Sequence, residues 1–295
     1  MGALIPTREQ LAAAPPPALP ASARLVILAT NWGFSGSLDA YCAAAKKEGY
    51  DGIEIWWPGS EAEQQELFAT LKKYGLEVGF LCAGFEKDPG QHLATFTRML
   101  EAAVDNPYQR PLYINCHSGR DYFTPDQGFR FMDATTAASK RTGIPVYHET
   151  HRSRLLYSAP VTRLYLERRP DLWINADLSH WCNVHESLLE DQEETLQLAL
   201  SRAGHIHARI GHPEGPQVND PRAPEWEHTL QRHLGWWDQI LAAKLRRGET
   251  TLTILTEFGP ADYMPTLPYT RSAVANQWEI NVYMLNLLRK RYTQN

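Results

Sequence analysis

Hydrophobic and polar positions follow a unit that recurs along the chain from Arg24 onward. Each unit begins with a short run of β-branched or aromatic residues, continues into an amphipathic segment of helical length, and stops at glycine or proline. Strands that alternate with helices in this way are typical of a closed parallel sheet. We therefore predict a single (β/α)8 barrel over residues 23–295, preceded by an N-terminal arm over residues 1–22. The eight expected strands are residues 24–32, 52–57, 77–85, 111–119, 145–151, 172–181, 205–211 and 251–260.

Local signals mark where the helices between these strands begin and end. Ser60 and Glu63 have the spacing of a capping box, in which each side chain accepts a free backbone N–H, and Thr124 and Gln127 repeat it. Asp88 precedes a proline, which suits the first helical position because an N–H there would have no partner. The expected stops are glycines, which adopt the left-handed conformation without steric cost: Gly49, Gly75, Gly143, Gly204 and Gly248.

Two segments depart from this rhythm. Residues 1–22 include three consecutive prolines from Pro15, which favour an extended arm of the polyproline type over a helix. Residues 212–226 contain four prolines and no hydrophobic period, directly after the expected seventh strand. Long ordered loops in compact domains are usually functional, and barrel enzymes keep their chemistry at the carboxyl ends of the strands. We therefore expect this loop to cover the active site.

Composition narrows the class of protein. Of the 295 residues, 43% are hydrophobic and 21% are charged, which is ordinary for a globular protein with a large core. The net charge of −5 argues against nucleic acid as a partner, because duplex binding normally needs a basic face. No apolar run approaches the ~20 residues that span a bilayer, and no signal peptide is recognisable. The four cysteines form no CxxC pair, so we expect buried thiols and a cytoplasmic protein without a membrane partner.

Charged residues gather where several expected strands end, although the interior of such a barrel is usually apolar. A carboxylate buried there needs a partner or a metal ion. Glu149, Asp177, His207 and Glu257 belong to four different strands, and the barrel would bring their side chains together at its axis. Three carboxylates and one imidazole suit Mn²⁺, Mg²⁺, Co²⁺ or Zn²⁺, so we predict that they hold one divalent ion. A thiolate-based zinc site is not expected, because no cysteine belongs to the group.

Motifs on the same strands give the chain a resemblance to a known family. The sequence reads DGIEIW around Glu54, YHETH on strand five, Asp-x-x-His on strand six, HxH on strand seven and TEFGP on strand eight. In this order and spacing the motifs resemble those of the xylose isomerase-like barrels, which include ketose 3-epimerases, sugar-phosphate isomerases and endonuclease IV. The resemblance covers nearly all of the chain after the arm, and implies a small carbohydrate substrate and metal ligation by the four residues above. It further implies that Glu149 and Glu257 act as an acid–base pair, that His180 contacts a substrate hydroxyl, and that Arg209 contacts a substrate oxyanion.

Four further side chains are candidates for substrate contact. Glu54, at the end of strand two, either touches the substrate or supports the ligands from behind. His117, at the end of strand four, either contacts the substrate or orients its neighbours. Trp56 either stacks on a sugar ring or packs in the barrel wall, and His212 either faces the pocket or is an ordinary loop residue.

These observations favour a metal-dependent sugar isomerase or epimerase that moves a proton next to a carbonyl group. A lyase or dehydratase stays open as an alternative, because removal of the same proton also begins a β-elimination. A phosphodiesterase of the endonuclease IV type would need a histidine on strand three and Asp-x-His after strand seven. Residues 81–85 contain no histidine, and Arg222 stands where the second ligand after Asp220 should be. A barrel used only for binding is disfavoured by the complete ligand set, and a homo-oligomer is compatible with the sequence.

Overall fold

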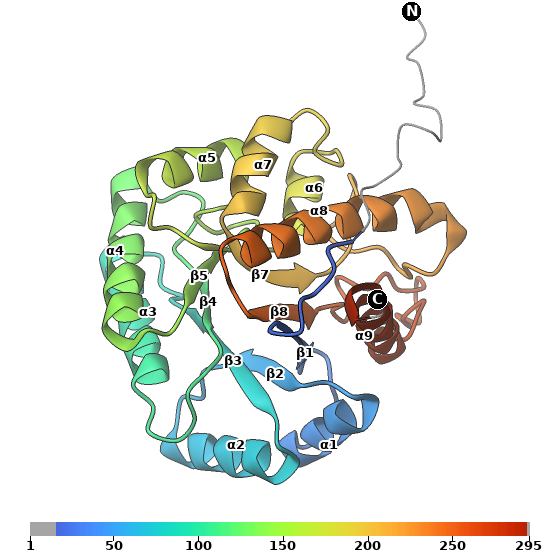
Figure 1. The fold of residues 1–295 in the computed structure, drawn as a ribbon, viewed down its shortest axis with the longest axis horizontal. Coiled ribbons are helices and arrows are strands. Elements are labelled where there is room, and N and C mark those ends of the chain that lie inside the picture. Colours follow the sequence, from blue (N-terminus) through green and yellow to red (C-terminus); the bar gives the residue numbers. More distant parts are fainter. Residues whose placement is uncertain (1–15, 294–295) are drawn as a thin grey trace, which may run out of the picture.

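The computed structural model describes residues 16–293, and its strands form one closed barrel (Figure 1). The strands are β1 (Arg24–Thr30), β2 (Gly52–Trp56), β3 (Glu77–Ala83), β4 (Ile114–His117), β5 (Val146–Glu149), β6 (Ile174–Ala176), β7 (Ala203–Ala208) and β8 (Thr251–Thr256). All neighbouring strands are parallel, and β1 pairs with β8 to close the sheet. The expected (β/α)8 barrel is therefore confirmed.

Helices surround the barrel on its outer side (Figure 1). They are α1 (Leu38–Glu48), α2 (Glu61–Tyr74), α3 (Pro89–Val104), α4 (Pro125–Thr142), α5 (Ala159–Arg168), α6 (Leu178–Val184), α7 (Glu193–Ser201), α8 (Glu227–Arg246) and α9 (Gln277–Thr293), with a 3-10 turn, η2 (Pro224–Trp226), before α8. Both α6 and α7 lie between β6 and β7, and α9 packs against β1 and β8, where the barrel closes.

Most helix boundaries follow the local signals in the sequence. Both expected capping boxes form, at the start of α2 and at the start of α4, and Asp88 caps α3 with its side chain. The left-handed conformation occurs at four of the five expected stops, Gly49, Gly75, Gly143 and Gly248. These elements are specified locally, because each signal acts within one helical turn.

Two boundaries differ from the expectation. Gly204 was expected to end a helix but lies inside β7, because α7 already ends at Ser201. A side chain at Gly204 would collide with the ring of Tyr147, so glycine is required there by packing and not by a turn. The sixth strand ends at Ala176, earlier than expected, because the Asp177 side chain accepts the N–H of Ser179 and starts α6. Both differences arise where tertiary contacts decide the local structure.

Apolar side chains form two layers, one on each side of the strands. The larger layer fills the space between the strands and the helices. The smaller layer consists of Val26, Leu28, Tyr113, Tyr147 and Leu255, which face the inside of the barrel because successive strand residues point to opposite faces. Further along the strands, toward the carboxyl end of the barrel, buried polar side chains such as Glu149 and His207 replace the apolar ones.

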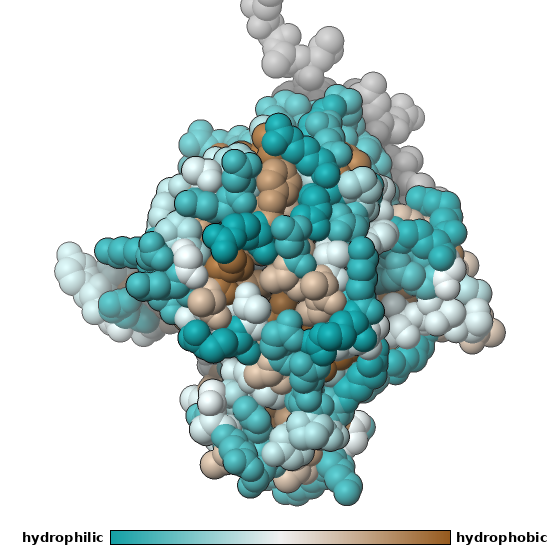
Figure 2. All heavy atoms as spheres, turned by 90° about the vertical axis from the view of Figure 1, so that its left-hand side faces the viewer, coloured by the Kyte–Doolittle hydropathy of each residue, from teal (hydrophilic) through white to brown (hydrophobic). Residues whose placement is uncertain are grey.

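The remaining expectations concern the arm, the cysteines and the surface. Most of the predicted arm lies outside the described residues, and within residues 16–22 Leu19 packs against the core. All four cysteines are buried free thiols. None of the described helices combines the length and the apolar character needed to cross a membrane. The face that carries α3 and α4 is mostly hydrophilic, with scattered apolar patches (Figure 2).

Candidate metal centre and active site

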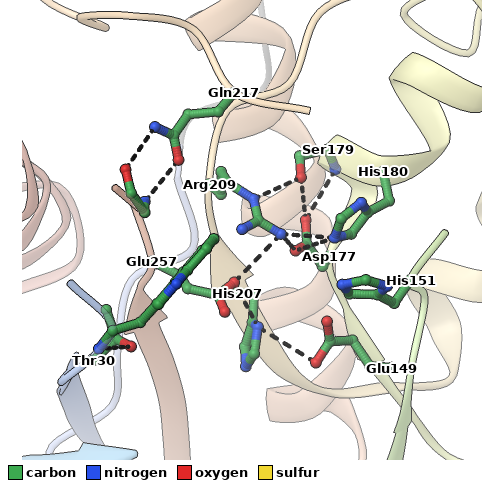
Figure 3. A network of polar contacts seen from close by, with 12 residues as sticks. Thr30, Glu149, His151, Asp177, Ser179, His180, His207, Arg209, Gln217 and Glu257 are labelled. Atoms are coloured by element: carbon green, nitrogen blue, oxygen red, sulfur yellow. Dashed lines mark hydrogen bonds and ion pairs between the residues drawn. The ribbon is translucent and has the colours of Figure 1, made fainter. Parts of the chain in front are cut away.

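Four strand ends bring the predicted metal ligands to one place at the carboxyl end of the barrel (Figure 3). Glu149 is the last residue of β5, and His207 lies near the end of β7. Asp177 directly follows β6, and Glu257 directly follows β8. Because the strands are parallel and the side chains alternate, all four point toward the barrel axis.

The distances between these groups are short enough for one ion to lie among them. Nδ1 of His207 lies 2.8 Å from Oε2 of Glu257 and 3.6 Å from Oε2 of Glu149. Ligand atoms of Glu149, Asp177 and His207 all lie within 4.8 Å of one another. In Figure 3 the carboxylates of Glu149 and Glu257 approach the same nitrogen of His207, Nδ1, from different directions. The structure therefore places all four predicted ligands in one cluster, which we call the ligand cluster.

Unsatisfied atoms show that the cluster suits a cation. Among the described residues, no group forms a hydrogen bond with the buried Oε1 of Glu149. Nδ1 of His207 and Oε2 of Glu257 are also buried and lie 2.8 Å apart, but not in hydrogen-bond geometry. Buried polar atoms normally form hydrogen bonds, so a group of buried carboxylate and imidazole atoms that do not is suited to a cation that accepts their lone pairs. Carboxylate oxygens and an imidazole nitrogen are suitable ligands for Mn²⁺, Mg²⁺, Co²⁺ or Zn²⁺.

The Glu54 carboxylate lies beneath His207 and is fully buried. Its oxygens lie 3.0 Å from Nε2 of His207 and 3.5 Å from Nε2 of His205, and one accepts a hydrogen bond of 2.7 Å from the Tyr113 hydroxyl. Burial opposes its charge, but His207 and His205 outweigh burial and lower the pKa of Glu54 well below its ordinary value. Glu54 thus contacts the far side of His207, away from the mouth of the barrel.

Glu149 is held by one of its two carboxylate oxygens. Oε2 accepts hydrogen bonds from Nδ2 of Asn115 at 2.6 Å and from Nδ2 of Asn175 at 3.3 Å, and lies 3.0 Å from Nε2 of His117. Burial favours the neutral acid, but His117 and His207 outweigh it and lower the pKa of Glu149. Oε1 is left free for a ligand. The two asparagines were not foreseen, although an Asn inside an apolar strand run was a visible signal.

Arg209 connects Asp177 with the rest of the cluster (Figure 3). Its Nη2 forms a salt bridge with Oδ2 of Asp177, and lies 2.8 Å from Nε2 of His180 and 3.6 Å from Oε2 of Glu257. The guanidinium also lies 4.8 Å from the centre of the Tyr263 ring. Burial raises the pKa of Asp177 to about 7, with Glu257 and Glu149 adding to it and Arg209 opposing it. Asp177 therefore carries a proton more readily than an ordinary aspartate.

The remaining candidates for substrate contact differ in whether they lie near the ligand cluster. His117, with its side chain 12% exposed, and Trp56, which is 38% exposed, lie edge to face with ring centres 5.3 Å apart at the mouth. His212, by contrast, packs on Trp226 with ring centres 4.9 Å apart, and its backbone pairs with Gly215. The structure thus brings His117 and Trp56 to the ligand cluster but not His212.

The proline-rich loop of residues 212–226 nevertheless lies at the expected end of the barrel. Its Gln217 accepts the N–H of Gly259 at 2.7 Å and donates to the carbonyl of the same residue at 3.1 Å (Figure 3). Gly259 follows Glu257 by two residues, so this pair of bonds ties the loop beside β8. Arg222 does not face the cluster, since it forms a salt bridge with Asp220 at 2.7 Å.

Comparisons with known proteins support the fold. No family model matches the chain, and no curated protein matches it significantly. Among solved structures, a 3-keto-D-glucoside 4-epimerase from Escherichia coli has a TM-score of 0.57 at 16% identity, covering 90% of this chain and 100% of that one. A probable 3-DHS dehydratase from Bacillus anthracis has a TM-score of 0.56 at 17% identity, covering 92% and 100%. Endonuclease IV from Thermus thermophilus has a TM-score of 0.51 at 14% identity, covering 91% and 98%.

These structures match the barrel of this chain over most of its length, so the resemblance inferred from the sequence is confirmed for the fold. Their titles name an epimerase, a dehydratase and an endonuclease, which are three different activities. Likeness of fold at this level of identity does not choose among them, because one barrel supports many chemistries. The chemistry of the residues in the ligand cluster is what can distinguish these activities.

Proposed function

We propose that the protein is a metal-dependent isomerase or epimerase of a sugar or sugar-like polyol, and that it transfers a proton next to a carbonyl group. The observation that carries the proposal is the close grouping of buried ligand atoms on Glu149, His207 and Glu257, with Asp177 beside them, in which the described residues leave Oε1 of Glu149 without a hydrogen bond. A divalent ion held there would polarise a carbonyl and its neighbouring hydroxyl, and so make the adjacent carbon-bound proton easier to remove.

Glu149 and Glu257 are the proposed acid–base pair. They come from β5 and β8, which are not neighbours in the barrel, and their carboxylates approach Nδ1 of His207 from different directions. Among the described residues, neither Oε1 of Glu149 nor Oε2 of Glu257 forms a hydrogen bond. One carboxylate can therefore take a proton from one face of a substrate while the other returns a proton to the opposite face, which inverts the carbon.

The surrounding residues have supporting roles in this proposal. Glu54 faces Nε2 of His207 and so directs Nδ1 toward the ligand cluster. His180 and Arg209 offer nitrogen atoms to substrate oxygens, and His117 and Trp56 line the mouth through which the substrate enters. His212 has no role, because it packs against Trp226.

The DNA-cleaving alternative finds no support in the site. β3 ends at Ala83 without a histidine, and Asp220 is paired with Arg222 instead of facing the ligand cluster. A cluster of several metal ions would need further ligands at these two places. One ion bound by four residues fits the described residues better.

The proposal is tested by isotope exchange with the metal-loaded protein. Purified protein is loaded with Mn²⁺, Mg²⁺, Co²⁺ or Zn²⁺ in turn and incubated with a panel of ketoses and aldoses in D₂O. We expect a product that is an isomer of the substrate and that carries solvent deuterium on the carbon beside the carbonyl. A product that has lost water would identify a lyase, and oxygen-18 from solvent in a cleaved product would identify a hydrolase. A protein that binds none of the four ions would contradict the proposal outright.

A further inference from the structure

Three arginines in the loops after β4 and β5 have no partner for their charge. They are Arg120, Arg152 and Arg154. No carboxylate of the described residues forms a salt bridge with any of them, and Arg152 bonds only to the Asn183 side chain, at 3.3 Å. Nε of Arg120 and both Nε and Nη1 of Arg154 are buried without a hydrogen-bond partner. Elsewhere at this end of the barrel, Arg209 and Arg222 each have an aspartate.

The two loops that carry these arginines pack closely together. The N–H of Leu155 donates to the carbonyl of Ser118 at 3.0 Å, which joins the loop after β5 to the loop after β4. Gly119 has a φ of +56°, and a Cβ there would lie 2.8 Å from the Leu155 side chain. Arg120 and Arg154 therefore flank a tight loop contact, and their backbones have little freedom to carry the guanidinium groups away into solvent.

The arginine group lies beside the ligand cluster. Arg154 follows Glu149 by five residues, and Arg120 follows β4, whose last residue, His117, lies 3.0 Å from Glu149. Cζ of Arg152 lies 4.9 Å from the centre of the Tyr263 ring. The same ring lies 4.8 Å from Cζ of Arg209, which binds Asp177 of the ligand cluster. Tyr263 thus lies between Arg152 and Arg209 of the site.

The charges of Arg120 and Arg154 lie close enough to oppose each other. Burial and the charge of Arg120 lower the pKa of Arg154, and the opposing effects of Glu149, Asp121 and Tyr263 do not restore it. The three arginines are half-buried, and guanidinium nitrogens that are shielded from water without an anion are costly, so such a site gains stability when an anion binds. Guanidinium groups also match the planar, two-oxygen geometry of carboxylates and phosphates.

We propose that Arg120, Arg152 and Arg154 bind an oxyanion, a carboxylate or phosphate, carried by the substrate. The substrate class is then an acidic sugar derivative, whose charged end lies against the loops after β4 and β5 while its carbonyl end reaches Glu149 and Glu257. The inference rests on the proposed function for the role of that carbonyl end. The oxyanion site itself stands on the unpaired guanidinium atoms.

The test compares ligands that differ only in charge. Binding of D-glucose, D-glucuronate and D-glucose 6-phosphate to the full-length protein is measured by calorimetry, with and without Mn²⁺. We expect at least one of the two anions to bind roughly tenfold or more tightly than glucose, with an affinity that falls as salt is added. The anion that binds better identifies the carboxylate or the phosphate as the preferred group. Equal affinities for all three ligands would overturn the inference.

Variants assign the effect to the arginines. R120M and R154M should each weaken binding of the preferred anion by roughly tenfold, the effect of losing a charge-assisted hydrogen bond, and should leave glucose binding unchanged. R222M is the matched control, because it removes the same charge at the same end of the barrel from an arginine that Asp220 already neutralises. Native-like anion binding in R120M and R154M would contradict the inference.

Measurements of stability distinguish an anion-binding role of Arg154 from a structural role. If Arg154 serves the fold, R154M should unfold more easily than the native protein, and R154K should restore stability. If it serves an anion, R154M should be as stable as the native protein or more so, because an unpaired buried charge has been removed. Anion binding without any isomerase activity would count against the proposed function alone, and isomerase activity on neutral sugars alone would count against this inference alone.

Discussion

At the scale of single residues, the two ring nitrogens of His207 have different surroundings, and only Nδ1 faces the ligand cluster. Glu54 faces Nε2 of His207, while Nδ1 lies among carboxylates, 2.8 Å from Oε2 of Glu257. Burial favours the neutral imidazole, but Glu257, Glu54 and Glu149 outweigh it and raise the pKa of His207 well above its ordinary value. A metal ion can bind Nδ1 only when that nitrogen carries no proton, so metal binding and protonation of His207 compete.

Replacing Glu54 should weaken metal binding without removing a ligand. In E54Q the buried carboxylate that faces His207 becomes neutral, so the imidazole loses its orienting partner and is less basic. We expect metal affinity to fall about 10- to 100-fold, as measured by competition with a fluorescent chelator. E225Q is the control, because Glu225 is exposed and should leave the affinity unchanged. Native-like affinity in E54Q would show that His207 is held by other contacts.

Replacing either proposed acid–base residue should affect turnover more than binding. In E149Q or E257Q the side chain keeps its size and one oxygen but cannot accept a proton at neutral pH. General acid–base catalysis is worth about 10²–10⁴-fold, so we expect kcat to fall on the order of a hundredfold or more, with a smaller change in KM. Metal content is measured in each variant, because loss of the ion would give the same result. Retained kcat with full metal content would remove that residue from the mechanism.

At the scale of elements, buried histidines connect helices to the loops that form the site. His233 on α8 accepts the N–H of Gly211 at 3.2 Å through Nε2, and its Nδ1 lies 2.9 Å from the carbonyl of Thr229. This contact fixes the beginning of the proline-rich loop of residues 212–226. Burial lowers the pKa of His233 to about 4, so the imidazole is neutral in the folded protein.

Stability should therefore decrease as the pH falls. The pKa of His233 is lower in the folded than in the unfolded chain, so the unfolded chain binds more protons below about pH 6.5. The contribution is fully present above that pH and is lost between about pH 6.5 and pH 4. We expect His233 alone to reduce the free energy of unfolding by about 2 kcal/mol between pH 7 and pH 5, as measured by urea denaturation.

Variants on the same helix test this assignment. H233Q should reduce the difference between the two pH values, although His148 and His205, with pKa values lowered by burial to about 3 and about 4, should leave part of it. H228Q should leave the difference unchanged, because His228 is exposed on the same helix. An unaltered pH dependence in H233Q would show that His233 is already protonated or that it titrates normally.

At the scale of the whole molecule, the ligand cluster brings together the carboxyl ends of four consecutive strands, which make up half of the barrel. Its members come from β5, β6, β7 and β8, and three of them are carboxylates whose charges repel one another when no cation is bound. Arg209 neutralises part of that charge through Asp177 and Glu257. A bound ion would therefore stabilise four consecutive strands at once.

Metal should raise the thermal stability of the folded protein. Binding to the folded state alone stabilises it by about 2.7 kcal/mol at an ion concentration about 100 times Kd. We expect the Tm to rise by several degrees when Mn²⁺ is added to protein treated with EDTA, as followed by calorimetry. H207Q should abolish the rise because it removes a ligand, whereas E225Q should retain it. An equal rise in H207Q would place the ion elsewhere.

Local patterns in the sequence determined the fold and the identity of the cluster. Alternating apolar positions, capping boxes and glycine stops act over a few residues, so the eight strands and most helix ends could be predicted without tertiary contacts. The four predicted ligands lie together because the order of strands fixes which ends meet. The fold needed only the spacing of residues along the chain, whereas the choice of these four ligands also used the resemblance of their motifs to the xylose isomerase-like barrels.

Only the tertiary structure decided which polar atoms remain without partners. Glu54 contacts His207 because the barrel interior places one side chain beneath the other, and His212 turns away because Trp226 packs against it. The unpaired guanidinium atoms of Arg120 and Arg154 could not be foreseen, since an arginine in a loop usually reaches solvent or a carboxylate. Pairing depends on distances between segments far apart in sequence, and those distances exist only once the barrel has closed.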